Sequence, residues 1–169
     1  MTGFVTEALR RDHRRDSFVS GVAALDRYLH ELALQDVKRR VAGCYVAVAD
    51  DGDIAGFYTL AATHVPMDAL PPETTKKLPR YPVVPAMLMG RLAVASKHQR
   101  HGLGRALVAD AVIRTSSLGI GAFALIVDAK DKAAVAFYEA SGFVAIPNEA
   151  RRLLLPIATG LEILAGKSK

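Results

Sequence analysis

The sequence predicts a mixed α/β domain, and three observations support this fold class. Apolar residues recur at three- and four-residue steps between Val22 and Val37, which is the spacing of an amphipathic helix. Apolar runs on both sides of DDGD (50–53) indicate two strands joined by a tight turn. In the second half, helical patterns alternate with apolar runs. The 169 residues, 51% of them hydrophobic, suffice for a single domain over residues 1–169.

The first predicted helix follows a basic head that spans Arg10 to Arg15. Ser20 is placed to act as its N-cap, and Gly43 lies beyond its end. The cations of segment 38–40 fall in its last turn, where the negative end of the helix dipole favours positive charge. We therefore expect a helix that begins just after residue 20 and ends near residue 40.

Two strands and a long loop are predicted next. CYVAVAD (44–50) and IAGFYTLAATHV (54–65) are the strands. Residues 66–85 hold six of the eight prolines and cannot form a regular central element. We interpret them as an exposed loop with one short helix near residues 73–78.

The second half is predicted to alternate strands with helices, and glycines end both helices. The segments are a strand over 84–95, a helix over 103–119, a strand over 121–129, a helix over 130–142, and strands over 143–146 and 151–157, with Asn148 and Glu149 near the final turn.

Composition excludes several classes of protein. Cys44 is the single cysteine, so the chain has no intrachain disulfide and no cysteine zinc cage, and we expect no metal site. Cys44 sits in an apolar strand and is interpreted as a core residue. The first fifteen residues are charged and lack an apolar signal core, and no segment has the roughly 18 apolar residues of a membrane span. A cytoplasmic protein is the expectation. The net charge of +5 fits an anionic ligand or a nucleic acid.

The stretch HQRHGLGRAL (98–107) lies between a predicted strand and a predicted helix. The first N–H groups of a helix have no intrahelical acceptor, and the dipole is positive there, so this is a natural anion site. Gly102 and Gly104 let an anion approach the backbone closely, while Arg100 and Arg105 can add charge-assisted hydrogen bonds. The stretch has neither the ending of a Walker A motif nor the third glycine of a Rossmann fingerprint.

Four motifs in sequence order resemble the GNAT N-acetyltransferases. GRLAV (90–94) precedes Gln99-x-x-Gly102-x-Gly104, the form of the family's acyl-CoA signature. AFALIVDA (122–129) follows, and AAVAFYEASGF (133–143) is similar to the family's A-x-x-F-Y-x-x-x-G-F segment. The resemblance extends from about residue 18 to 157.

The resemblance implies a GNAT fold, in which a mixed central sheet is flanked by helices, its fourth and fifth strands splay apart, and acetyl-CoA lies in the gap. Backbone groups of segment 92–94 would bind the pantetheine amides as an added strand does, and an N–H there would stabilise the thioester oxyanion. This chain departs from the family at Arg100, where many members have Gly, and at Asp131, where an Asn is common. The implied cofactor-binding residues are Leu92, Ala93, Val94, Gln99, Arg100, His101, Gly102, Leu103, Gly104, Arg105 and Asp131.

Tyr138 occupies the position of the family's general acid, and a phenol is protonated at neutral pH. Adjacent helical residues point about 100° apart, so we expect Phe137 in the core and Tyr138 in the acid role. The amine would attack the thioester directly, without an acyl-enzyme. No general base is assigned, because His64 and His98 are expected in loops or on the surface. Asp128 and Asp131 are interpreted as caps of the Tyr138 helix.

Two segments further resemble the GNAT toxins of toxin–antitoxin pairs: residues 18–48 (FVSG…LD…YL…QD…RR) and RYPVVPAMLMGRLAV (80–94). That resemblance implies acetylation of the α-amino group of aminoacyl-tRNA, which blocks translation, a homodimer, and neutralisation by a ribbon-helix-helix antitoxin. Basic residues would contact RNA phosphates, and Tyr81 offers a stacking surface. The candidates, beside the basic head, are Arg91, Lys38, Arg39, Arg40, Lys76, Lys77 and Arg80.

Two alternatives stay open. One is a GNAT acetyltransferase of a small amine or a protein N-terminus, although the chain has no acidic cluster beyond residues 50–53 that would suit a polyamine. The other is a non-catalytic module that binds CoA or an antitoxin.

Overall fold

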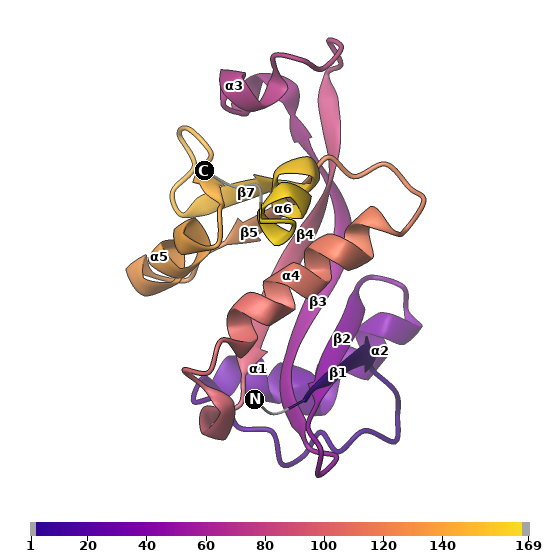
Figure 1. Cartoon of the computed structure of the whole chain (residues 1–169). Coiled ribbons are helices and arrows are strands. Elements are labelled where there is room, and N and C mark those ends of the chain that lie inside the picture. The colour runs from indigo at the N-terminus through magenta and orange to yellow at the C-terminus, as the bar shows by residue number, and fades with distance from the viewer. Residues whose placement is uncertain (1–2, 167–169) are drawn as a thin grey trace. The chain divides into compact units, whose positions relative to one another are not determined.

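The computed structural model describes residues 3–166 and forms the predicted mixed α/β fold (Figure 1). Seven strands form one sheet in the order β1-β2-β3-β4-β5-β7-β6. The strands are β1 (Val5–Ala8), β2 (Gly43–Val48), β3 (Ile54–Pro66), β4 (Val83–Val94), β5 (Ala124–Asp128), β6 (Val144–Ala145) and β7 (Arg152–Pro156). The helices are α1 (Ala23–Arg27), α2 (Ala33–Lys38), α3 (Pro72–Thr75), α4 (Leu103–Ser116), α5 (Lys132–Ala140) and α6 (Ile157–Leu164).

The sheet is mixed because β4 and β5 pair in parallel, whereas β2 pairs antiparallel with β1 and β3, and β7 with β5 and β6. A parallel pair needs a crossover connection, and α4 supplies it. The residues fall into two compact units, Met1–Ala61 with Gly90–Asp110 and Ala62–Met89 with Ala111–Lys169. Strands β3 and β4 and helix α4 each contribute to both units. The single domain over residues 1–169 stays a prediction.

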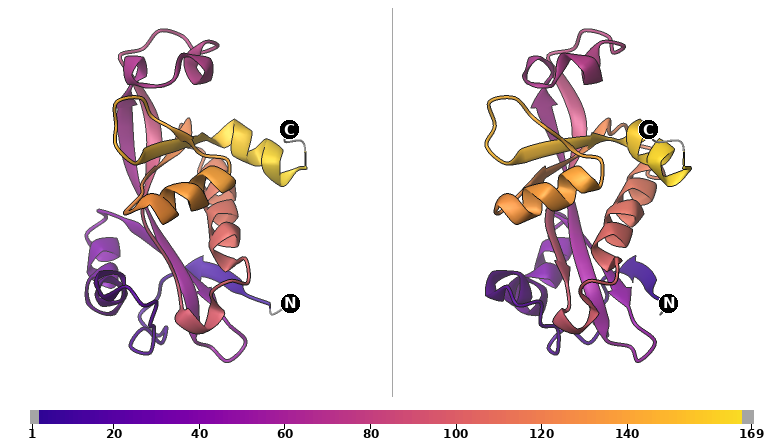
Figure 2. Two further views of the ribbon diagram at one scale, coloured as in Figure 1. Left: turned by 90° about the vertical axis from the view of Figure 1, so that its left-hand side faces the viewer. Right: turned by 60° about the vertical axis from the view of Figure 1, so that its left-hand side comes forward.

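In the first unit, the two faces of β2 and β3 pack against different helices, as the alternation of side chains requires. Cys44, Val46 and Phe57 belong to one apolar cluster with residues of α1 and α2. On the opposite face, Gly56 lies against Leu107 of α4. Figure 2 shows α1 and α2 on one side of these strands and the start of α4 on the other.

The second unit has its own core. Leu154 of β7 packs in one apolar cluster with Ile126 of β5 and with Leu70 of the loop between β3 and β4. Leu155 points to the other face of β7, where Gly160 of α6 lies against Val112 of α4. A Cβ at Gly160 would lie 3.0 Å from both Val112 methyl groups, so this glycine permits the close packing of α6.

The first predicted helix forms and ends at Lys38, close to the predicted residue 40 and before Gly43, but its predicted N-cap is wrong. The N-cap is Val22, while the Ser20 hydroxyl accepts a hydrogen bond from the Val22 amide and donates one to Asp26. At the other end Arg40 takes the left-handed conformation (φ 62°), and Gly43 already belongs to β2. A π-helical turn over Tyr28–Leu32 separates α1 from α2, and the periodic pattern gave no sign of it.

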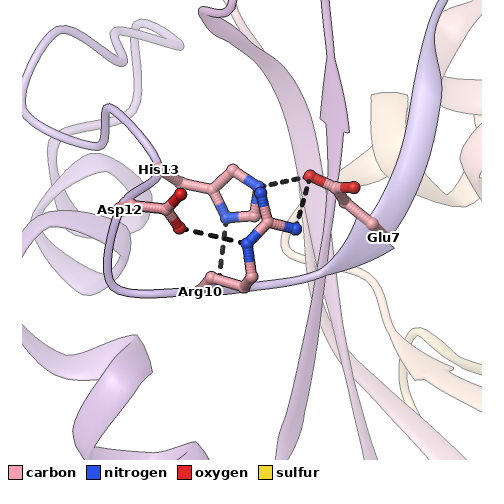
Figure 3. A network of polar contacts seen from close by, with 4 residues as sticks. All are labelled: Glu7, Arg10, Asp12 and His13. Atoms are coloured by element: carbon pink, nitrogen blue, oxygen red, sulfur yellow. Dashed lines mark hydrogen bonds and ion pairs between the residues drawn. The ribbon is translucent and has the colours of Figure 1, made fainter.

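Two elements were not predicted, β1 and α6. Strand β1 pairs with β2 from Val5↔Val48 to Ala8↔Tyr45. The chain then turns through a polar network, in which His13 Nε2 lies 2.6 Å from a Glu7 carboxylate oxygen and His13 Nδ1 accepts the Arg10 amide (Figure 3). Arg10 also forms ion pairs with Glu7 and Asp12, so part of the predicted basic head is neutralised within its own segment.

Several predicted boundaries move. Strand β4 begins at Val83, one residue before the predicted strand and inside the segment predicted as a loop, and the carbonyl of Pro85 accepts the Phe123 amide. The short helix is α3, four residues long, and α4 ends at Ser116 rather than at Gly119. Asp128, predicted as a cap, lies in β5 and pairs with Arg152 at 2.8 Å.

Within residues 3–166, no helix is long and apolar enough to cross a membrane. The same residues contain no group of three or more His, Cys, Asp or Glu side chains that could hold a metal ion.

Candidate active site

The loop between β4 and α4 forms an open backbone cradle. Arg100 (φ 67°) and Gly102 (φ 83°) both adopt the left-handed conformation. The first hydrogen bond of α4 runs from the Ala106 amide to the Gly102 carbonyl, and the amides of residues 100–104 donate to no described acceptor. A Cβ at Gly102 would meet nothing within 4 Å, so the space before α4 is open. Such a cradle suits a phosphate group.

Gln99 holds this loop in place. Its side-chain amide donates to the carbonyl of Ser20 at 2.8 Å and to the carbonyl of Val94 at 2.9 Å. Both donors of the side chain are therefore used inside the protein. The predicted cofactor contact of Gln99 stays a prediction, and the structure shows that its side chain also positions the cradle.

The strand segment Arg91–Val94 leads into the loop. Ala93 is buried in the first unit, and a Cβ at Gly56 would lie 3.0 Å from the Ala93 carbonyl oxygen. Leu92 and Val94 alternate with Ala93 and are half-buried. The described pairing of β4 with β5 covers Ala86 to Leu88 and ends before this segment, as the expected splaying of these strands requires.

Arg91 stacks on an aromatic ring. Its guanidinium carbon lies 3.6 Å from the centroid of Tyr28, which is 4% exposed, and the Tyr28 hydroxyl donates to Asp36 at 2.8 Å. Burial, together with this hydrogen bond, raises the pKa of Tyr28. Cation–π attraction therefore holds the guanidinium over the ring. The π-helical turn that carries Tyr28 was not foreseen from the sequence.

Helix α5 carries Tyr138, and the prediction that Phe137 is the core residue of the pair is wrong, whereas the acid role of Tyr138 stays a prediction. Tyr138 is buried at 9% exposure, whereas Phe137 is only half-buried. The Tyr138 ring packs edge-on against Phe143, with centroids 5.2 Å apart, because the turn after α5 folds Phe143 back beneath it. Burial raises the pKa of Tyr138 to about 12, so the phenol is protonated at neutral pH. Asp131 caps α5 as predicted, accepting the Ala134 amide at 2.9 Å.

The predicted RNA-contacting cations form two exposed groups. Lys38, Arg39 and Arg40 follow one another at the end of α2 in the first unit. The second group lies in the loop after β3, in the second unit, where Lys76 and Arg80 line a pocket and Lys77 is exposed beside it.

The other reactive side chains fall where they were expected. Cys44 is 2% exposed, and burial raises the pKa of its thiol to about 12, so it is a core residue and not a nucleophile. His64 is exposed. The His98 ring packs edge-on against Phe4 in the loop before α4, and its Nε2 is buried with no hydrogen-bond partner among the residues described.

Comparisons with known proteins agree with this geometry. A tRNA-acetylating toxin of Mycobacterium tuberculosis (strain ATCC 25618 / H37Rv) is 36% identical over 141 residues, which cover 82% of this chain and 83% of the relative. AtaT complexed with acetyl-methionyl-tRNAfMet has a TM-score of 0.86 at 26% identity, covering 96% of this chain and 99% of that one. AtaTR bound with acetyl-CoA has a TM-score of 0.81 at 26% identity, covering 95% and 98%.

The model of the acetyltransferase (GNAT) family matches residues 6–143, a span that includes the cradle, segment 91–94 and Tyr138. The resemblance predicted from the four motifs is thereby confirmed. This chain belongs to the acetyltransferase (GNAT) family and is an acetyl-CoA-dependent N-acetyltransferase.

Proposed function

We propose that this protein is a toxin that acetylates the α-amino group of aminoacyl-tRNA and thereby blocks translation. The observation that carries this assignment is the 36% identity to a tRNA-acetylating toxin over most of both chains. The likeness to AtaT, whose structure holds acetyl-methionyl-tRNA, supports the same substrate class. An α-amino group has a pKa near 8 and is partly neutral at physiological pH, so the reaction needs no strong base.

The open amides before α4 fit the pyrophosphate of acetyl-CoA, which supplies the acetyl group as a thioester. His101, Leu103 and Gly104 would donate backbone N–H groups from the cradle, and the side chains of Arg100 and Arg105 would add positive charge. The backbone of Leu92–Val94 would bind the pantetheine amides, and one N–H there would stabilise the oxyanion. Asp131 would complete the set at the start of α5.

Tyr138 would donate its phenolic proton to the leaving thiolate. Two properties of its environment support this role. The phenol is held protonated by burial, and no hydrogen bond to its hydroxyl is described within residues 3–166, so the proton is not engaged elsewhere. Removing the hydroxyl while keeping the ring would therefore remove the acid and leave the packing against Phe143 intact.

The exposed cations would contact the RNA backbone. Lys38, Arg39 and Arg40 offer a row of positive charge in the first unit, and Arg91 offers a guanidinium already fixed on Tyr28. Lys76, Lys77 and Arg80 would form the second contact. A toxin also needs an inhibitor, so we propose a ribbon-helix-helix antitoxin as partner and a homodimer as the active form. The substrate places the reaction in the cytoplasm.

The test is to incubate the protein with labelled acetyl-CoA and a pool of charged tRNA. We expect label on charged tRNA and none on uncharged tRNA. Tyr138→Phe should lower the rate by about 10²- to 10⁴-fold, the usual contribution of a general acid, with an unchanged melting temperature. If the protein binds acetyl-CoA but labels no tRNA, the substrate is a small amine or a protein N-terminus. If induction arrests growth equally with Tyr138→Phe, a non-catalytic role replaces the enzymatic one.

A further inference from the structure

The loop between β3 and β4 encloses a pocket of about 490 Å³. The Met67 amide donates to the Pro82 carbonyl at 3.1 Å and closes the base of the loop, and Leu70 anchors the loop in the core of the second unit at 4% exposure. Met67 and Leu78 give the pocket apolar walls. The volume is within the range of about 300–1,000 Å³ that is typical of ligand sites.

The polar lining of this pocket favours an anion next to a flat ring. Lys76 and Arg80 are exposed and form no described ion pair, and Asp68 is the single carboxylate of the lining, so two positive charges face one negative charge. Tyr81 is 62% exposed, and its ring has no aromatic partner within the described part of the chain. Cations beside a free aromatic ring are the combination with which proteins bind unpaired nucleotides.

The pocket is separate from the proposed acid. Both belong to the second unit, where α3 lies at the tip of β3 and β4, while α5 with Tyr138 lies beside β5 and β7 (Figures 1 and 2). A ligand of the pocket would therefore affect binding of a large substrate without touching the residue that donates the proton.

We propose that this pocket binds an unpaired nucleotide of the tRNA substrate, with the base stacked on Tyr81 and a flanking phosphate on Lys76 and Arg80. The Asp68 carboxylate and the Thr75 hydroxyl lie in the same lining and can accept hydrogen bonds from base amino groups or a ribose hydroxyl. The proposal rests on the function proposed above and specifies what the second RNA contact named there would bind. It accounts for an exposed tyrosine in a loop whose Met67, Leu70 and Leu78 side chains are partly or fully buried.

The experiment measures the Kd of a short single-stranded RNA that carries the acceptor-end sequence, and the KM of charged tRNA, for four variants. Tyr81→Ala should raise both the Kd and the KM by roughly 5- to 150-fold, the range for loss of one stacked base. The kcat and the salt dependence of binding should stay unchanged. Tyr81→Phe keeps the ring and should bind as the wild type does. Arg80→Ala should lower the slope of log Kd against log salt by about one. Arg27→Ala removes an exposed arginine outside the pocket and should leave both constants unchanged.

Equal Kd and KM values for Tyr81→Ala and the wild type would overturn the proposal that the pocket binds a nucleotide. In that case, acetylation of charged tRNA by the wild-type protein would still support the proposed function. Failure of the wild type to acetylate tRNA would refute that function alone, since the oligonucleotide titration still reports on the pocket. If Tyr81→Ala binds RNA normally but escapes neutralisation by the antitoxin, the pocket binds protein instead.

Discussion

In the first unit, a Cβ at Gly56 of β3 would meet both the proposed cofactor-binding strand segment and α4, and Gly56→Ala tests how much the site depends on this close packing. A Cβ at Gly56 would lie 2.9 Å from Leu107 Cδ1, 3.0 Å from the Ala93 carbonyl oxygen and 3.4 Å from Leu103 Cδ2. The leucine methyl groups can rotate away, but the carbonyl is part of the backbone of β4 and can move only if the strand moves.

The expected cost follows from two opposing effects. Inserting a methyl group into a packed core costs about 1–3 kcal/mol. Replacing glycine by alanine in a strand recovers about 0.5–1 kcal/mol of backbone entropy. The net loss of unfolding free energy is thus between about 0 and 2.5 kcal/mol, and its midpoint of about 1 kcal/mol corresponds to about 2–4 °C in melting temperature for a chain of this length.

Differential scanning calorimetry and titration with acetyl-CoA check this prediction. We expect Gly56→Ala to lower the melting temperature and to weaken acetyl-CoA binding, because displacement of the Ala93 carbonyl distorts the strand segment next to the cradle. Gly121→Ala is the matched control, since a Cβ there meets nothing within 4 Å and its substitution should be neutral or stabilising by about 0.4–1 kcal/mol. A Gly56→Ala protein with a raised melting temperature and unchanged acetyl-CoA affinity would refute the reasoning.

Three further predictions concern the cradle and the buried titratable groups. Arg100 adopts the left-handed conformation (φ 67°), which glycine tolerates better, so Arg100→Gly should raise the unfolding free energy by about 1–2 kcal/mol and with it the melting temperature. The same substitution should weaken acetyl-CoA binding, because it removes a positive charge from the cradle. Scanning calorimetry measures the first effect and titration calorimetry the second. Gln99→Glu turns a donor into a carboxylate facing two carbonyls, and it should raise the KM for acetyl-CoA more than Gln99→Ala does. Burial raises the pKa of the Cys44 thiol from 9.0 to about 12, so the thiol ionises at a lower pH in the unfolded chain than in the folded protein. The unfolding free energy measured in urea should therefore be constant below about pH 9 and should fall as the pH rises toward 12. The slope should shrink in Cys44→Ala.

Much of the fold could be predicted because its signals are local. The periodic apolar pattern of residues 22–37, the apolar runs on both sides of residues 50–53 and the prolines of the loop after β3 each act within a few residues. Strand β1 was missed because VTEA is short and only half apolar. The strand is held in place by its pairing with β2 and by a hydrogen bond from Thr6 to Asp110, two contacts with residues distant in the sequence. Helix α6 was missed because Gly160 is a poor helix former, and only the packing against Val112 shows why it is there.

The candidate site divides in the same way. Sequence identified the residue types of the cradle and the Phe137–Tyr138 pair, because each belongs to a contiguous motif. The wrong ring was assigned to the core from the sequence. Helical geometry predicts that the side chains of two adjacent residues of α5 point in different directions, but it does not predict which of the two is buried. That choice depends on Phe143, which the turn after α5 folds back onto Tyr138. Burial of the Tyr138 phenol would suit the proposed acid role, because a raised pKa keeps the proton on the hydroxyl.

The first residue of the glycine signature acts in this chain through distant partners. Gln99 spans from Val94, five residues before it, to Ser20, 79 residues before it, and the Ser20 amide and hydroxyl in turn bind Asp26 of α1. The conformation of the cradle is therefore coupled to the N-terminal helix as well as to the strand that precedes it. Because both side-chain donors of Gln99 serve this purpose, the proposed binding of the acetyl-CoA pyrophosphate would fall to the backbone amides of the cradle. Substitutions near Ser20 should thus affect acetyl-CoA affinity although the motif itself is untouched.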